Sequence, residues 1–458
     1  MNLDLTEGPI TSKLLKFAFP LMIGNLLQQL YNIADTLIVG RFLGPNALAA
    51  VGSAYTLMVF LTSILLGLCM GSSAFFSIQY GKRDLERLKN GFFLSFLLIG
   101  SVALILNILV FTGIDRIIAL LKIPAEITGM MKEYLLCIFI GISATFLYNY
   151  FANLLRSVGN SLTPLIFLAV SALLNIALDL LFVITFGWGV WGAAAATVSS
   201  QYVSGIGIML YYWFGFPELR VQRCHLRWNS SILKEITGLS FLTCVQQSVM
   251  NLGILMVQGL VNSFGTVVMA AFAAGVKIDS FAYMPVQDFG NAFSTFIAQN
   301  YGAGKKERIQ KGISSAILCS VSFSLAVSLF VFLFARPLMG IFIKASDTNI
   351  LAVGVQYLRI EGSFYFGIGI LFLLYGFYRA ISKPGMSVVL TVISLGTRVL
   401  LAYLISPIPV IGVTGIWAAV PIGWILADTV GILYYLTVQR KKLFSPSTAA
   451  DTAPSSTQ

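Results

Sequence analysis

The stretch "LLQQLYNIADTLIVGRFLG", from Leu26 to Gly44, decides the fold, because it holds one acid inside an otherwise apolar run. The run begins near Leu14 and continues to about Val39. About 20 apolar residues in a helix cross the roughly 30 Å hydrocarbon core of a bilayer, so this segment is long enough to span it. Asp35 is then an intramembrane acid, a kind of residue that is costly in lipid and usually functional.

The rest of the chain consists of similar runs. Of its 458 residues, 57% are hydrophobic and only 10% are charged, whereas soluble domains carry about 25% charged residues. The runs are continuous rather than alternating, which argues against a transmembrane barrel. We therefore predict an all-α polytopic protein embedded in the lipid bilayer. The first run is too long for a cleavable leader, so none is expected.

Basic residues predict the topology. We expect twelve spans, and 20 of the 29 Lys and Arg residues fall in connections on the side that also carries both termini, with Arg156 and Arg379 counted among them. Six fall on the opposite side. The positive-inside rule places the basic side and both termini in the cytoplasm. This topology also explains the net charge of +11 without a nucleic-acid partner. The expected spans lie near residues 13–40, 47–78, 90–112, 130–156, 163–186, 190–214, 233–262, 267–300, 311–335, 352–379, 385–407 and 412–437.

The chain repeats itself. "YGKRDLERLKNG" at 80–91 matches "YGAGKKERIQKG" at 301–312 with a constant offset of 221, and "GVWGAAAA" at 189 matches "GVTGIWAA" at 412 with an offset of 223. Each repeat has six spans, so both enter the membrane in the same direction. We expect two six-helix bundles related by a pseudo-twofold axis along the membrane normal. The predicted parts are an N-terminal lobe (1–214), a cytoplasmic linker (215–232), a C-terminal lobe (233–442) and a disordered tail (443–458).

Polar side chains form stripes in two spans of the first lobe. In the first span, Asn25, Gln28, Asn32 and Asp35 are spaced by 3, 4 and 3 residues, which places them on one helix face. Such a face should point into the bundle or a water-filled cavity. Pro20 precedes the stripe; it removes a backbone hydrogen bond and can bend the helix, which suits either a moving or a statically kinked segment.

The fifth span repeats this pattern. Ser171, Asn175 and Asp179 follow one another at steps of four residues, and the sixth span offers Thr197 among small residues that permit close helix approach. Two carboxylates, an amide and a hydroxyl form an all-oxygen set, which suits protons and hard cations better than soft metals.

These motifs together resemble the multidrug and toxic compound extrusion (MATE) transporters of the prokaryotic branch. The resemblance covers nearly the whole chain. It rests on "ADTLIVGRFLG" (34–44), "LLRSVGNSLTP" (154–164), "NIALD" (175–179), "GVWGAAAATVSSQ" (189–201) and the paired loops "QYGKRD" and "QNYGAGKKE".

The resemblance implies a secondary antiporter of the prokaryotic cytoplasmic membrane. It would export cationic or amphiphilic small molecules in exchange for inward H⁺ or Na⁺, as a monomer and without a cofactor. A lipid-linked saccharide flippase of the same superfamily is the alternative. The resemblance assigns coupling, or Na⁺ binding, to the oxygens of Asp35, Asn175, Asp179 and Thr197, with Asn153 nearby. Pro20, Gln28, Asn32 and Asn153 are expected at the substrate cavity and its gate.

Enzyme functions lack their motifs. The chain has no Gly-Asp pair for an intramembrane aspartyl protease and no GxxxxGK[ST] loop for an ATP motor. The five cysteines show no metal spacing, and the single histidine, His225, lies in a basic loop, so the carboxylates must carry any proton coupling.

The second lobe breaks the symmetry, because Asp35 falls on Met256 at the offset of 221. Gln residues occupy the seventh span where some family members have an acid, so we expect coupling in the first lobe. Two roles stay open for the other intramembrane charges, as ion pairs that neutralise one another or as substrate contacts. These charges are Lys277, Asp279, Asp288, Arg359, Glu361, Arg398 and Asp428.

Overall fold

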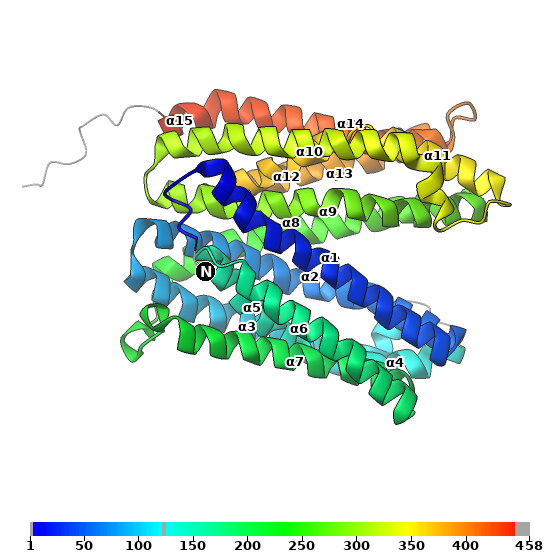
Figure 1. The fold of residues 1–458 in the computed structure, drawn as a ribbon, viewed down its shortest axis with the longest axis horizontal. Coiled ribbons are helices and arrows are strands. Elements are labelled where there is room, and N and C mark those ends of the chain that lie inside the picture. Colours follow the sequence, from blue (N-terminus) through cyan, green and yellow to red (C-terminus); the bar gives the residue numbers. More distant parts are fainter. Residues whose placement is uncertain (1–2, 121–124, 445–458) are drawn as a thin grey trace, which may run out of the picture.

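The computed structural model describes residues 3–120 and 125–444, and within them the chain is helical and contains no β-strand. Its long helices run side by side along one axis (Figure 1). The first half contains α1 (Ile10–Phe42), α2 (Pro45–Lys82), α3 (Leu85–Leu120), α4 (Ala125–Ile140), α5 (Ile142–Ser157), α6 (Leu162–Asp179) and α7 (Gly189–Gly215). The second half contains α8 (Ser230–Asn262), α9 (Thr266–Gly302), α10 (Lys306–Gly340), α11 (Thr348–Gly362), α12 (Tyr365–Ala380), α13 (Pro384–Ile405), α14 (Val413–Tyr434) and the short α15 (Arg440–Phe444).

The helices agree with the predicted spans, except that two spans are bent. In the described residues, ten helices are long and apolar enough to cross a membrane, and two bent pairs bring the number of spans to twelve. The predicted span 130–156 is α4 and α5, bent by 44°, and 352–379 is α11 and α12, bent by 50°. At the first bend, a Cβ on Gly141 would lie 2.7 Å from Val198 Cγ2, so the glycine leaves room for α7.

Three predicted boundaries need correction. Helix α7 includes residue 215 and α8 begins at Ser230, so the linker is shorter than predicted; it contains two short 3₁₀ turns, Pro217–Leu219 and Arg223–His225. Leu443 and Phe444, placed in the tail by composition, form the end of α15. The other residues of the predicted tail, 445–458, lie outside the described residues.

The internal repeat appears as pairs of equivalent contacts. Gly44 precedes α2 with φ of 88° and Gly265 precedes α9 with φ of 92°; a positive φ favours glycine at both turns. Phe75 packs against Gly91, and the residues 221 positions later, Phe296 and Gly312, make the same contact. The two six-span bundles are therefore related by the predicted pseudo-twofold axis.

Helix α1 contacts both halves. Its early residues Leu14, Phe17 and Leu21 belong to an apolar core built mainly by the second half. Its later residues Ile38 and Val39 belong to the core of the first half. Figure 1 shows α1 crossing obliquely over the other helices in this way. Helix α1 therefore forms part of both apolar cores.

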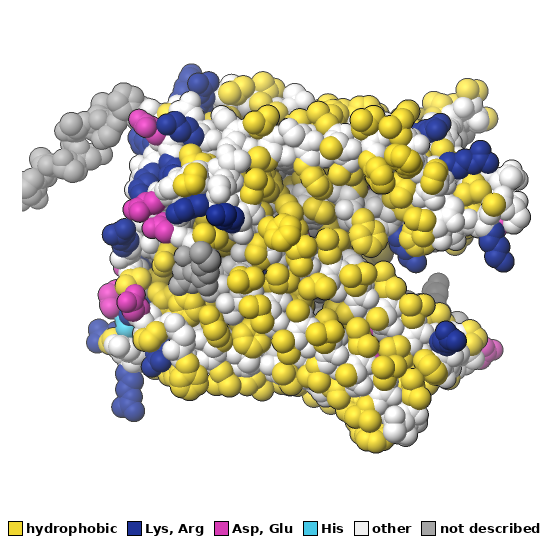
Figure 2. All heavy atoms as spheres, viewed as in Figure 1, with side chains coloured by type: hydrophobic (Ala, Val, Ile, Leu, Met, Phe, Trp, Pro, Cys, Tyr) yellow, Lys and Arg dark blue, Asp and Glu magenta, His cyan; other side chains and the backbone are white. Residues whose placement is uncertain are grey.

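The two ends of the bundle differ in charge. Figure 2 shows a broad apolar band, with more Lys and Arg side chains at the end that carries the N terminus. We call this the basic end; it contains Lys82, Arg87, Arg220, Lys305 and Arg308. At the opposite end the surface is hollowed between the two halves, and we call this the open end.

Glycines close the basic end. A Cβ on Gly81 of α2 would lie 2.0 Å from the backbone oxygen of Gln299, and a Cβ on Gly302 of α9 would lie 2.0 Å from that of Ile78. These two contacts are related by the repeat offset of 221. Since only glycine permits backbones to approach so closely, the "YG" motif of both loops forms a tight crossing of α2 and α9.

A strap formed by residues 3–8 covers this crossing. The Leu3 amide donates to Gly159 O in the first half at 3.0 Å. On the second half, the Arg308 guanidinium donates to the carbonyl oxygens of Leu5, Glu7 and Gly8 at 3.1, 2.7 and 2.7 Å. The strap therefore links the two halves at the basic end.

Candidate functional site

Two carboxyl groups from different helices meet in the first half. Asp35 lies on α1 and Asp179 is the last residue of α6, and the two acids are close enough to interact electrostatically. Oδ1 of each carboxyl group is buried and has no hydrogen-bond partner in the described residues. Asp179 has no exposed surface. Two ionised carboxylates so close together repel each other, so a shared proton or a small cation would stabilise the pair. The pair is therefore suited to exchange one proton, or to hold one small cation between its oxygens.

Asn175 and Thr197 complete the acid pair. Asn175 lies one turn before Asp179 on α6, and Thr197 faces it from α7. The amide orientation that satisfies both of its ends donates to Asp179 Oδ2 at 3.3 Å and accepts from Thr197 Oγ1 at 3.3 Å. The structure thus brings together all four residues assigned to the coupling site; we call them the acid cluster.

Local structure explains how the acid cluster is assembled. The α-helix ends at Asp179 and continues as a π-helical turn, Leu180–Thr185; such turns are rare and often lie at functional sites. On α7, Ala193, Ala194 and Ala196 have no exposed surface. These small side chains allow α6 and α7 to pack closely.

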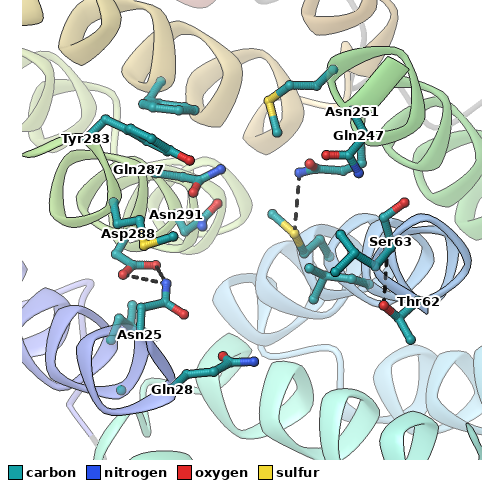
Figure 3. A pocket seen from close by; sticks show the side chains of 18 of the residues that line it. Asn25, Gln28, Thr62, Ser63, Gln247, Asn251, Tyr283, Gln287, Asp288 and Asn291 are labelled. Carbon is teal, nitrogen blue, oxygen red and sulfur yellow. Dashed lines mark hydrogen bonds between the residues drawn. The ribbon is translucent and has the colours of Figure 1, made fainter. Parts of the chain in front are cut away.

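A cavity of about 620 Å³ lies between the two halves. Its wall is rich in carboxamide side chains from α1, α8 and α9, and Figure 3 shows several of them arranged around an open centre. Neither Asp35 nor Asp179 lines this cavity. The acid cluster and the cavity are therefore neighbouring but separate, and α1 contributes to both. The carboxamides of these three helices are Asn25, Gln28, Gln29, Asn32, Gln247, Asn251, Gln287 and Asn291.

The residues expected at the cavity are mostly found there. Gln28, Asn32 and Asn153 line it, and Asn153 also donates to Asn149 O at 2.8 Å. Pro20 does not line the cavity, and α1 continues through it as a single helix from Ile10 to Phe42. Pro20 is therefore not part of the cavity wall in this conformation, and its role in gating stays a prediction. The apolar first turns of α1 pack against the second half and hold this part of the helix in place.

Comparisons with known proteins identify the family. A family model described as MatE matches residues 20–181 and 240–404. The chain belongs to the MatE family. A probable multidrug resistance protein, YpnP of Bacillus subtilis, is 30% identical over 85% of this chain and 87% of that protein. A FAD transporter of Shewanella oneidensis is 26% identical over 98% of both chains.

A solved structure shows the same MATE architecture. It is described as the outward-facing conformation of a multidrug resistance MATE family transporter of the MOP superfamily. It has a TM-score of 0.90 and 25% identity, covering 97% of this chain and 100% of that chain. The recognition of a prokaryotic MATE transporter from the sequence is therefore confirmed.

The intramembrane charges of the second half form no ion pair within 4 Å in the described residues. Each of the four ion pairs within the described residues involves residues of the loops or helix ends rather than this group. Asp279 instead accepts hydrogen bonds from Tyr357 and Tyr365. Lys277 and Arg359 lie over the rings of Phe342 and Phe332, at 5.8 and 5.3 Å.

Two arginines were misplaced by the charge count. Arg156 and Arg379 were assigned to connections, but they lie on α5 and α12 and line the cavity. Arg379 is buried and donates to Asn291 Oδ1 at 2.9 Å and Ser294 Oγ at 3.3 Å. The repeat offset of 223 relates the two arginines, a signal that could have revealed their equivalent positions.

Proposed function

We propose that this MATE transporter exports cationic or amphiphilic small molecules from the cytoplasm in exchange for H⁺ or Na⁺. Membership of the family and the names of the relatives support multidrug efflux. The observation that carries the antiport mechanism is the pair of neighbouring acids Asp35 and Asp179, each with a buried oxygen that has no hydrogen-bond partner among the described residues, because a proton or a small cation would stabilise such a pair.

The acid cluster is the proposed coupling site. Adding a proton or Na⁺ removes the repulsion between the two carboxylates, and losing it restores that repulsion. Asn175 and Thr197 supply further oxygens that a Na⁺ ion would use, since hard cations prefer oxygen ligands. Because Asp35 lies on α1, each change of charge alters the contact between α1 and α6.

Helix α1 is the proposed link between coupling and transport. It carries Asp35 at one end, cavity residues such as Gln28 and Asn32 in the middle, and apolar contacts to the second half at its start. Movement of α1 would change the cavity wall and the packing between halves together. This is the requirement for alternating access around a central site.

We infer the orientation from charge. The basic end would face the cytoplasm, with both termini there, following the positive-inside rule. The conformation is then closed toward the cytoplasm by the crossing of α2 and α9 and open toward the exterior. The cavity would release substrate from this state and take up the coupling ion. We further propose that the monomer is the transporting unit, since each chain contains a complete cavity and acid cluster.

The test uses everted membrane vesicles and the fluorescent cation ethidium. An acidic lumen, or a high luminal Na⁺ concentration, is imposed separately, and accumulation of ethidium is followed. A gradient of two pH units supplies about 2.7 kcal/mol per proton, enough for a roughly 100-fold substrate gradient at one-to-one exchange. FAD is included as an anionic substrate, because one relative bears that name.

The proposal requires that at least one gradient drives accumulation and that Asp35→Asn abolishes it. Equal accumulation by the wild type and Asp35→Asn under both gradients would refute coupling through the acid cluster. Accumulation that needs neither gradient would refute antiport.

A further inference from the structure

Asp288 is an acid of the cavity wall with few partners. It lies on α9 and is 5% exposed. Both carboxylate oxygens accept from the same group, Nδ2 of Asn25 on α1, at 2.6 and 2.7 Å. Figure 3 shows the two side chains meeting at the edge of the open centre of the cavity.

This carboxylate is under-satisfied. An ionised carboxylate has about four acceptor sites, and one neutral amide supplies both hydrogen bonds that Asp288 accepts. No Lys or Arg within the described residues lies within 4 Å of it. Arg156 acts on it only through space. A charge so poorly compensated in a membrane protein generally marks a functional position.

The other two acids of the cavity wall, Asp279 and Glu361, have different partners. Asp279 accepts hydrogen bonds from both Tyr357 and Tyr365. Glu361 Oε2 is buried without a hydrogen-bond partner in the described part of the chain, and Arg398 acts on this acid through space, as Arg156 does on Asp288. Asp288 differs from both because its carboxylate lies at the edge of the open centre of the cavity and is held by one amide from α1.

Its position connects the ligand to α1. Asn25 is the first residue of the polar stripe that ends at Asp35, ten residues or about 15 Å further along the helix. The Asn25–Asp288 contact joins α1 to the second half, near the point where α1 leaves that half. A ligand that binds Asp288 must share the carboxylate with Asn25 or displace it.

We propose that Asp288 binds the positive group of an organic cation that carries N–H donors, such as an alkylammonium. While the cavity is empty, the Asn25 amide donates to the carboxylate, because its N–H groups are donors like those of an ammonium. Cation binding weakens the hold of the second half on α1. This inference rests on the proposed export of cations and assigns it a binding residue.

The test compares two ligands that differ in one charge. Dansylcadaverine carries a primary ammonium, and its N-acetyl derivative is neutral with the same fluorophore. Dissociation constants are measured by fluorescence with the purified full-length protein in nanodiscs, without any ion gradient. The variants are Asp288→Asn, Asp288→Glu and Asn25→Ala. Asp347→Asn is the matched control, because Asp347 is exposed and does not line the cavity.

The expected result is a wild-type preference for the ammonium of about tenfold or more, since charge-assisted hydrogen bonds are the strong ones. Asp288→Asn reduces the preference to about twofold or less. Asp288→Glu and the Asp347→Asn control retain it. Asn25→Ala keeps or increases it, because the competing donor is gone.

Three results would overturn the inference. They are the absence of a preference in the wild type, an unchanged preference in Asp288→Asn, and a loss in Asn25→Ala equal to that in Asp288→Asn. The last would show that Asp288 only anchors α1. If Asp288→Asn does not fold, the Asn25→Ala variant decides: a retained or increased preference for the ammonium supports the inference, and a lost preference overturns it. Failure of ethidium accumulation in vesicles would refute the proposed function separately, because these binding measurements need no gradient.

Discussion

The crossing of α2 and α9 predicts that one methyl group can change which side of the membrane the cavity faces. In Gly81→Ala the new Cβ would lie 2.0 Å from Gln299 O, where ordinary contact begins at 3.4 Å. The helices must therefore separate by about 1.4 Å. Overpacking of this kind costs about 1–3 kcal/mol, and only the conformation closed at the basic end bears that cost. The population open at the basic end should rise about 5- to 150-fold.

The assay is thiol labelling in everted vesicles. Ser294→Cys is introduced on α9, where Ser294 is 5% exposed and lines the cavity, after the native cysteines have been replaced. A membrane-impermeant maleimide added at the basic end should label Gly81→Ala at least about five times faster than the parent. Gly238→Ala is the control, because a Cβ there meets nothing within 4 Å. Equal labelling rates of folded Gly81→Ala and folded Gly238→Ala would refute the reasoning.

Three further predictions concern the strap, the acid cluster and the first turn. Arg308→Ala removes three hydrogen bonds to the strap and should lower the melting temperature by several degrees in scanning fluorimetry, whereas an unchanged value would show that the strap does not hold the basic end. Asn175→Ala removes the amide between Asp179 and Thr197; it should slow gradient-driven ethidium accumulation about tenfold while ethidium still binds, and a normal rate would exclude the amide from coupling. Gly44→Ala places a Cβ at φ of 88° and ψ of −179°, a region that essentially only glycine adopts, and should destabilise the protein by about 1–3 kcal/mol in chemical denaturation; equal stability would contradict the strain.

The acid cluster could be predicted because it depends on helix periodicity. Asp35 ends one polar stripe and Asn175 and Asp179 form another, and a 3.6-residue period places each stripe on one face. Because polar side chains are costly in contact with lipid, both faces are expected to point into the interior of the bundle. The spans could be predicted because an apolar run of about 20 residues is long enough to cross the bilayer as a helix.

Contacts between the halves could not be predicted in this way. The Asn25–Asp288 bond depends on the rotation of α1 against α9, which side-chain packing sets and periodicity does not. The bend at Gly141 depends on the approach of Val198 from another helix. The π-helical turn after Asp179 adds one residue to a turn, a local change with no compositional signal.

The central claim is that the Asp35–Asp179 pair holds a proton whose release is linked to substrate binding. The most direct measurement is proton release when ethidium is added to the purified protein in weakly buffered solution, followed with a pH indicator between about pH 5 and 9. Linkage requires that a proton which weakens ethidium binding is released when ethidium binds. We predict about one proton per bound ethidium for the wild type in part of this range, and none for Asp35→Asn. The same release from Asp35→Asn as from the wild type would contradict the claim.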